Sequence, residues 1–353
     1  MVTIEQELED LLLSALKLNA SDLHLTVGYK PTVRIDGVLL PLEDFSVLTA
    51  EHAGELAFAL LGERKNDFLE RKETDFSYAF RDKARFRINI FLEKGFVSSA
   101  LRLIPQKIRT LEELNLPPAL HRIAKLKQGF ILLTGPSGHG KSTTLAALID
   151  EINRERAEHI ITIEDPIEYL FIGEKSIVNQ REIGGDTKSF HNALSSILRE
   201  DPDIIMIGEM RDPETIAAAL TAAETGHLVL SSLHTNSASQ TIDRIIDVFP
   251  PQQQNQIRLQ LANTLSAIIS QRLLPRVSGG RIPATEVMFS SSAVSNLIRE
   301  AKAHQIDLVI ETSLENGMIS LNRSLAELVR RGEAEPEVAM AYSLNPAELQ
   351  TRL

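Results

Sequence analysis

Residues 130–149 read FILLT-GPSGHGKST-TLAALI, and this stretch decides the fold. Its apolar start, Phe130–Thr134, has the length and composition of a buried parallel strand. Its end, Thr144–Ile149, is a typical helix opening. The loop between them, Gly135–Thr143, fits the pattern G-x-x-x-x-G-K-[ST], which cradles phosphates in nucleotide-binding proteins. A strand, a glycine-rich loop and a helix in this order predict a nucleotide site, and they disfavour a chance match in a glycine turn.

The loop also predicts how phosphate is held. Glycines let the backbone wrap closely, so that N–H groups point inward with the helix N-terminus behind them. Lys141 supplies a point charge for the β- and γ-phosphates, and the Ser142 hydroxyl is placed for Mg²⁺. The predicted ATP-binding residues are Gly135, Ser137, Gly138, His139, Gly140, Lys141, Ser142 and Thr143.

Composition narrows the class of protein. The chain has 353 residues, a length that favours two domains. Its net charge of −11 argues against a protein whose main function is to bind nucleic acid. Cysteine is absent, so disulfides and thiolate chemistry are excluded. The N-terminus is acidic, unlike a signal peptide, and no apolar run approaches the ~20 residues of a membrane span. These features favour a cytoplasmic protein.

Residues 1–104 predict a small α+β domain with a mostly antiparallel sheet. Leucines and an alanine recur between Leu8 and Leu16 at helical spacing. Strands are expected at 23–27, on both sides of an Asp36-Gly37 turn, and at 75–80, 85–91 and 97–103, with a turn at Asp82-Lys83. Thr49 is expected to cap a helix that reaches Leu61. Prolines mark residues 105–117 as a linker.

Residues 118–353 predict an α/β domain, because strands alternate with helices from Gly129 onward. Strands are expected at 129–134, 159–164, 204–208 and 227–233. A helix over 216–223 is framed by Asp212-Pro213 and Gly226. Beyond this, the chain is expected to be helical from about 254 to 353, first from Gln254 towards Leu273 and most clearly at 296–303 and 321–331.

Hydrolysis of a nucleotide needs carboxylates at the ends of the strands, and two candidates follow apolar runs. Glu209 ends Asp203–Glu209, the general form of a Walker B segment, and Glu164 ends a second strand. Both should emerge at the carboxyl edge of the sheet beside the P-loop. Such an acid can hold Mg²⁺ through water or take a proton from the attacking water; a helix cap or surface position is the alternative for each. His234 either senses the γ-phosphate or is a buried structural histidine.

These motifs together resemble one family, the ATPases of bacterial secretion systems and type IV pili. Residues 163–168 resemble the Asp box of this family, residues 200–212 its Walker B region, and residues 224–235 its His box. Four further segments also match the family, at residues 20–24, 84–89, 241–250 and 270–273. The most similar group is the retraction ATPases, whose C-terminal motif A-I-R-N-L-I-R-E is matched at 293–300 except by Val294 and Ser295. In the loop, Ser137 and His139 stand where Thr and Ser are usual. We expect both replacements to be tolerated, because the backbone of the loop makes most of the phosphate contacts.

The resemblance implies a PAS-like N-terminal domain, a RecA-like ATPase domain and a homo-hexameric ring that hydrolyses ATP with Mg²⁺ at the junction of domains and subunits. It implies that Glu164 is the general base and that Glu209 stabilises Mg²⁺ and its waters. Arg87 and Arg102 match positions that supply arginine fingers to the phosphates.

The implied function is a motor for type IV pilus retraction and twitching motility. It would act at the cytoplasmic face of the inner membrane, peripheral to it, and reach pilin subunits indirectly through an inner-membrane platform protein. A pilus-assembly or type II secretion ATPase is the nearest alternative. A RecA-like nucleic-acid motor is more distant, because the acidic balance and 5% aromatic content disfavour nucleic acid as a partner.

Overall fold

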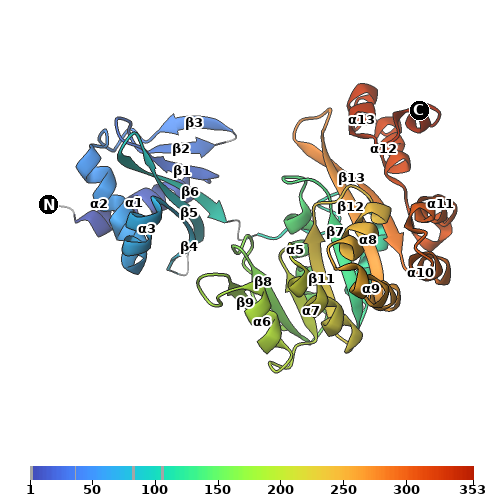
Figure 1. Cartoon of the computed structure of the whole chain (residues 1–353). Helices are drawn as coiled ribbons and strands as arrows, with labels where there is room; N and C mark the ends of the chain where they lie inside the picture. The colour runs from blue at the N-terminus through green and yellow to red at the C-terminus, as the bar shows by residue number, and fades with distance from the viewer. Residues whose placement is uncertain (1–2, 36, 82–83, 105–106) are drawn as a thin grey trace. The chain divides into compact units, whose positions relative to one another are not determined.

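The computed structural model describes residues 3–35, 37–81, 84–104 and 107–353. Contacts divide the chain into two compact units, Met1–Lys107 with Pro166–Leu170, and Ile108–Asp165 with Phe171–Leu353 (Figure 1). The turn residues Asp36, Asp82 and Lys83, and Pro105 of the expected linker, lie outside the described residues. The boundaries at 104 and 117 stay predictions. None of the described helices combines the length and apolarity that a membrane crossing requires.

The first unit is a six-stranded antiparallel sheet with helices, as predicted; its order is β3-β2-β1-β6-β5-β4. Its elements are α1 (Ile4–Lys17), β1 (Asp22–Leu25), β2 (Thr32–Ile35), β3 (Val38–Pro41), α2 (Ala50–Leu61), α3 (Lys65–Arg71), β4 (Glu73–Phe80), β5 (Ala84–Glu93) and β6 (Phe96–Ile104). Helix α1 begins at a capping box, in which Thr3 and Gln6 bond each other's backbone N–H. Thr49 is the N-cap of helix α2, as predicted, and its side chain accepts a hydrogen bond from the His52 N–H. The leucine stripe of α1 is buried in this unit's core.

The second unit is a seven-stranded sheet of order β13-β12-β7-β11-β10-β8-β9, parallel except for β13. Its first elements are α4 (His121–Ala124), β7 (Gly129–Thr134), α5 (Lys141–Glu155), β8 (His159–Glu164), β9 (Ile177–Glu182), α6 (Phe190–Ile197), β10 (Ile204–Ile207), α7 (Pro213–Glu224) and β11 (Leu228–Leu233). They continue with α8 (Ala238–Asp247), α9 (Pro251–Thr264), β12 (Leu265–Pro275), β13 (Arg281–Phe289), α10 (Ser292–Arg299), α11 (Ile306–Thr312), α12 (Leu321–Arg330), α13 (Pro336–Tyr342) and α14 (Pro346–Gln350).

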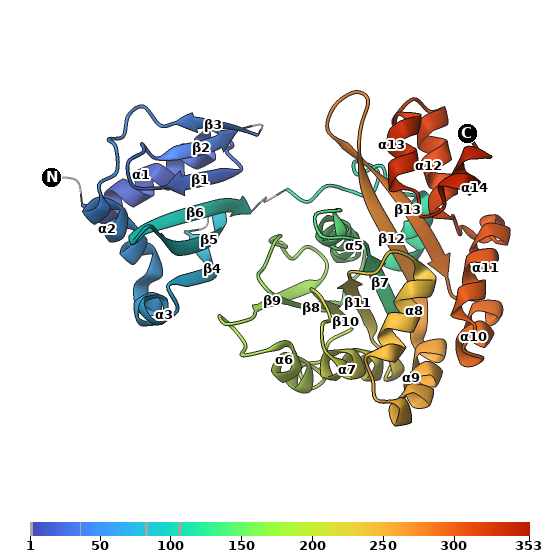
Figure 2. The same ribbon diagram turned by 45° about the horizontal axis from the view of Figure 1, so that its top comes forward.

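The strand order fixes the layers. From β7 the chain crosses to β8 in one direction, and from β9 it returns through β10 and β11 to β12 in the other. Because such crossovers are right-handed, α5 lies on one face of the sheet and α6, α7, α8 and α9 lie on the other (Figure 2). All parallel strands end at the same edge, so the loops after β7, β8, β10 and β11 gather there.

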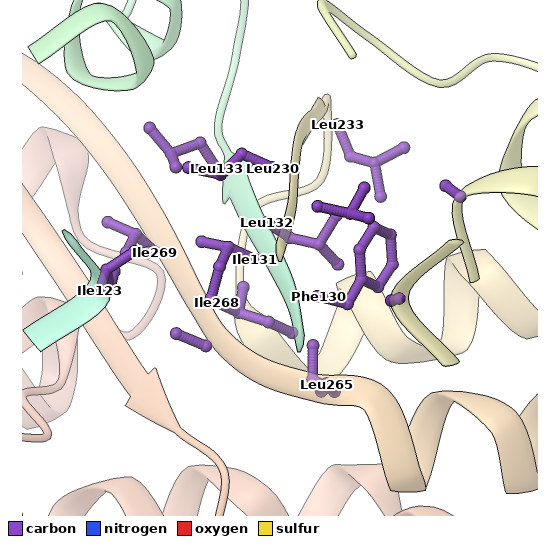
Figure 3. Packing of buried hydrophobic residues seen from close by; sticks show 14 of the residues in the cluster. Ile123, Phe130, Ile131, Leu132, Leu133, Leu230, Leu233, Leu265, Ile268 and Ile269 are labelled. Atoms are coloured by element: carbon purple, nitrogen blue, oxygen red, sulfur yellow. The ribbon is translucent and has the colours of Figure 1, made fainter. Parts of the chain in front are cut away.

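Strand β7 lies at the centre of the core. All six of its residues are buried, and Phe130 to Leu133 are surrounded by side chains from β11 and β12 (Figure 3). Burial on both faces explains why this strand is a continuous apolar run rather than an alternating one. Asp212 is the N-cap of helix α7, and its side chain accepts a hydrogen bond from the Thr215 N–H. The helix ends before Gly226, as the sequence predicts.

The expectation of helix from Gln254 to Leu273 is wrong in its second half. Helix α9 ends at Thr264, and Leu265–Pro275 is strand β12, which pairs with β7 on one side and β13 on the other. An apolar run buried on both faces has no period that separates strand from helix. The β-branched pair Ile268-Ile269 is the local sign of a strand. The C-terminal region is therefore helical only from α10 onward. The helix expected at 296–303 is displaced toward the N-terminus, because α10 begins at Ser292 and ends at Arg299.

Candidate functional site

The phosphate loop is shaped by close packing against β12. Gly135 and Gly140 have φ of 140° and 82°, in the left-handed region. A Cβ on Gly135 would lie 2.4 Å from the carbonyl oxygen of Gln271, and one on Gly140 would lie 2.8 Å from the Gln271 Nε2. A side chain at Gly135 would therefore collide with the backbone of β12, whereas one at Gly140 would be strained by its φ and would displace the Gln271 amide. Because Gly140 is the N-cap of α5, the loop leads directly into the helix N-terminus, where backbone N–H groups face an anion.

Lys141 is folded back over this loop. Its buried ammonium donates to the carbonyl oxygens of Gly135, at 2.8 Å, and Pro136, at 3.0 Å. Ser142 follows in the first turn of α5 with its side chain exposed, and Thr143 is half-buried. The Lys141 ammonium therefore lies against the loop, and the Ser142 hydroxyl lies at the start of α5.

His234 joins the loop to the acid after β10. Its Nδ1 lies 3.4 Å from the Lys141 Nζ and 3.5 Å from the Ser137 Oγ, and its Nε2 lies 3.1 Å from Glu209 Oε2. Lysine can only donate, so the contact with Lys141 assigns Nδ1 as an acceptor and Nε2–H as the donor to Glu209. The side chain is 48% exposed, which excludes the alternative of a buried structural histidine.

Glu209 lies between two partners at the end of β10. Besides His234 it forms an ion pair with Arg211, while its side chain is only 18% exposed. A carboxylate held by two donors keeps a fixed direction, which suits an acid that orders water around a cation. The structure thus brings together four predicted site residues: Ser137, Lys141, Glu209 and His234.

Glu164 ends β8 at the same edge of the sheet, in a different environment. It is 6% exposed, and its Oε1 accepts from the Thr162 hydroxyl at 2.6 Å and from the Gln180 amide at 3.0 Å. Two neutral donors on this oxygen hold the carboxyl group in a fixed orientation. This arrangement suits a group that must accept a proton.

Arg87 and Arg102 belong to the first unit. They are directly opposite each other on β5 and β6, so they share one face of that sheet. Arg87 bonds Asp75 at 2.6 Å, Arg102 bonds Asp22 at 2.9 Å, and the two side chains are 41% and 71% exposed. Burial alone would raise the pKa of Asp22, but hydrogen bonds from Arg102 and Ser21 outweigh it and hold that pKa below its usual range.

Gln271 is a site residue that the sequence reasoning did not identify. Its amide donates to the His139 carbonyl at 2.8 Å and accepts from the Thr144 hydroxyl at 2.9 Å, so it ties the loop to α5. The Leu273 N–H donates to the His139 Nδ1 at 3.0 Å. Burial, together with the cations Arg272 and Lys141, lowers the pKa of His139. The family resemblance at residues 270–273 points to this segment. A helix there, as the sequence led us to expect, would not pair with the strand before the loop.

Known proteins are similar to this chain over most of its length. The family model described as type II/IV secretion system protein matches residues 2–281. The type IV pilus retraction ATPase PilT of Pseudomonas aeruginosa is 46% identical over 332 residues, which cover 92% of this chain and 95% of that protein. A twitching motility protein of Neisseria gonorrhoeae is 45% identical over 317 residues, covering 89% and 84%.

A solved structure is similar as well. The crystal structure of the pilus retraction motor PilT with bound ADP has a TM-score of 0.91 and 48% identity to this chain, covering 97% of this chain and 98% of that one. The similarity therefore includes both compact units and the P-loop.

Proposed function

The chain belongs to the type II/IV secretion system protein family, and we propose that it is an ATPase that powers type IV pilus retraction and twitching motility. The observation that carries this proposal is the full-length similarity to a pilus retraction motor that binds ADP. The cluster of Lys141, His234 and Glu209 beside the P-loop supports it, because a nucleotide in the loop would meet a cation, an imidazole that can form hydrogen bonds, and an acid.

Phosphate binding would change the partners of Lys141. The ammonium of Lys141 is held by two loop carbonyls, which are neutral acceptors. Phosphate oxygens are charged acceptors and bind the same ammonium more strongly. Nucleotide entry would therefore redirect Lys141 from the loop to the β- and γ-phosphates, while the glycine-shaped backbone supplies N–H groups to the same oxygens.

Mg²⁺ fits the residues present, since the exposed Ser142 hydroxyl and the oriented Glu209 carboxylate are both oxygen donors. Mg²⁺ bound with a nucleotide keeps several waters, so Ser142 would bind it directly and Glu209 through water. When bound, the ion neutralises charge on the phosphates.

We assign the general-base role to Glu164. Its Oε1 is held by Thr162 and Gln180, so the carboxyl group is oriented before a substrate arrives. Removing a proton from the attacking water is worth about 10²–10⁴ in rate.

Arg87 and Arg102 are proposed as arginine fingers. Two guanidinium groups directly opposite each other on one sheet face repel, and each is compensated by an aspartate. Both side chains are exposed enough to exchange a carboxylate for a phosphate. Within a homo-hexamer at the cytoplasmic face of the inner membrane, a neighbouring copy would supply them, and the ring would act on pilin through a membrane platform protein.

A genetic experiment tests the function. A deletion strain carries the wild-type gene, Lys141→Ala or Glu209→Ala, and is scored for twitching and for surface pili. Retraction predicts no twitching with pili present or in excess for both variants. Cells without pili would indicate an assembly motor, and unchanged twitching with unchanged surface pili would remove both pilus functions. Purified Lys141→Ala should lack the ATPase activity of the wild type.

A further inference from the structure

A row of buried polar side chains crosses three strands behind the P-loop. Thr134 on β7 is opposite Ser270 on β12, and Ser270 is opposite Glu286 on β13. The Thr134 and Ser270 hydroxyl oxygens are 2.8 Å apart, and the Ser270 Oγ lies 3.5 Å from Glu286 Oε1. The three residues are 0%, 1% and 7% exposed. Because Glu286 accepts from Ser270, Thr134 is the donor to Ser270, and the row has one direction.

The row ends on the backbone of α8. The N–H of Ala238, the first residue of that helix, donates to Glu286 Oε1 at 2.7 Å. A helix N-terminus leaves such N–H groups without intrahelical partners, and it attracts negative charge. One carboxyl oxygen therefore accepts from both the row and the helix.

Each end of the row borders the candidate site. Thr134 directly precedes Gly135 of the P-loop, and His234 begins the short loop that ends at Ala238. Arg272, which shares the sheet face of Ser270, donates to the Asn236 side chain in this loop at 2.8 Å. Strands β12 and β13 thus hold the base of the P-loop and the loop of His234 from the same side.

We propose that Glu286 is a positioning residue for ATP hydrolysis, which fixes the His234 loop against the base of the P-loop through Ala238 and Ser270. The inference rests on the proposed ATPase function. Glu286 does not touch the nucleotide; it acts by setting the distance of His234 from Lys141 and Glu209.

A purely stabilising role explains this residue poorly. Burial raises the pKa of Glu286 to about 7; the Ala238 N–H, Ser270 and Arg272 lower it, while Asp307 on α11 raises it further. An apolar side chain of similar volume generally stabilises a core at least as well as a buried charge. A leucine at position 286 would lack the oxygen that accepts hydrogen bonds from both Ala238 and Ser270.

The test compares Glu286→Leu, which keeps the volume but removes the acceptor, with Glu286→Gln, which keeps an oxygen in place. A control variant is Val287→Ala, a neighbouring buried residue of β13 that faces the other side of the sheet. We expect Glu286→Leu to lower kcat roughly tenfold with the Kd for ADP within about threefold of wild type, and Glu286→Gln to recover most of the loss. Val287→Ala should reduce the midpoint of unfolding while kcat falls less.

The decisive measurement repeats these variants in a His234→Ala background. If Glu286 acts through His234, the kcat loss of Glu286→Leu largely disappears there. An equal loss in both backgrounds, or Glu286→Gln as impaired as Glu286→Leu, overturns the proposal. If the leucine variant does not fold, Ser270→Ala takes its place, with a smaller kcat loss that must also vanish with His234. A wild-type chain without ATPase activity would instead overturn the proposed function.

Discussion

At the scale of single residues, the neighbours of each ionisable group decide its role. Lys141 is a pure donor, so its contact assigns the His234 Nδ1 as an acceptor and Nε2–H as the donor to Glu209. Glu164 and Glu209 both end strands of the same sheet, yet one is held by a hydroxyl and an amide and the other by a histidine and an arginine. We therefore assign different roles to the two acids, Glu164 as the proposed base and Glu209 as the proposed group that orders water around Mg²⁺.

Glu164→Gln should abolish hydrolysis while ATP still binds. The amide keeps the shape of the carboxyl group and an oxygen for Thr162 but accepts no proton, so kcat should fall about 10²–10⁴-fold. Steady-state kinetics and binding of a fluorescent, non-hydrolysable ATP analogue measure the two effects. Glu168→Gln, an exposed acid of the same motif, is the control. A loss of kcat no larger than the control's would assign the base elsewhere.

The buried Glu286 predicts a pH dependence of stability. Its pKa rises from 4.5 to about 7 on folding, so the folded state binds a proton that the unfolded state releases between these values. The free energy of unfolding therefore falls as pH rises through this window. Relative to Glu286→Gln, the wild type should lose about 2 kcal/mol between pH 5 and pH 8. Denaturant unfolding of both at the two pH values checks this; parallel behaviour would contradict it.

At the scale of elements, the contact between the P-loop and β12 determines the shape of the phosphate site. The sequence places the loop between strand and helix, but its backbone path depends on Gln271 from a strand more than a hundred residues away. The glycines of the loop therefore differ in how closely other parts of the chain pack against them. Gly135 is confined by β12, whereas a Cβ on Gly138 would meet nothing within 4 Å.

This difference can be tested with two matched substitutions. Gly138 has φ of 78° and Gly135 has φ of 140°, so alanine is strained at both positions. Only Gly135→Ala adds a backbone clash, so it should abolish binding of a fluorescent ADP analogue and lower the thermal midpoint. Gly138→Ala should bind with moderately reduced affinity. Equal effects of the two variants would mean that φ alone, and not packing on β12, requires glycine here.

At the scale of the whole molecule, the proposed site needs groups from two copies of the chain. The P-loop with its acids lies on the second compact unit, and the arginine pair lies on the first. A subunit that lacks Lys141 still carries intact arginines, and a subunit that lacks Arg102 still carries an intact P-loop.

Mixed rings test this arrangement. Lys141→Ala and Arg102→Ala should each be inactive alone, and co-expression should restore activity at about a quarter of the sites if a neighbour completes each site in a ring. The control mixes Lys141→Ala with Glu209→Ala, both defective in the same half of the site, and should recover nothing. Absence of recovery in the first mixture, with mixed rings present, would place the arginines in the same copy as the P-loop.

Elements with local signals could be predicted from the amino-acid sequence alone. Strand β7, the glycine loop, helix α7 with its cap at Asp212, and the acids Glu164 and Glu209 all follow from periodicity and short-range chemistry. Only the tertiary structure decided that Leu265–Pro275 is a strand, that Gln271 shapes the loop, and that Glu286 meets Ala238. The physical reason is that these features arise from pairing between segments distant in the chain, and a strand buried on both faces carries no periodicity that would reveal its partners.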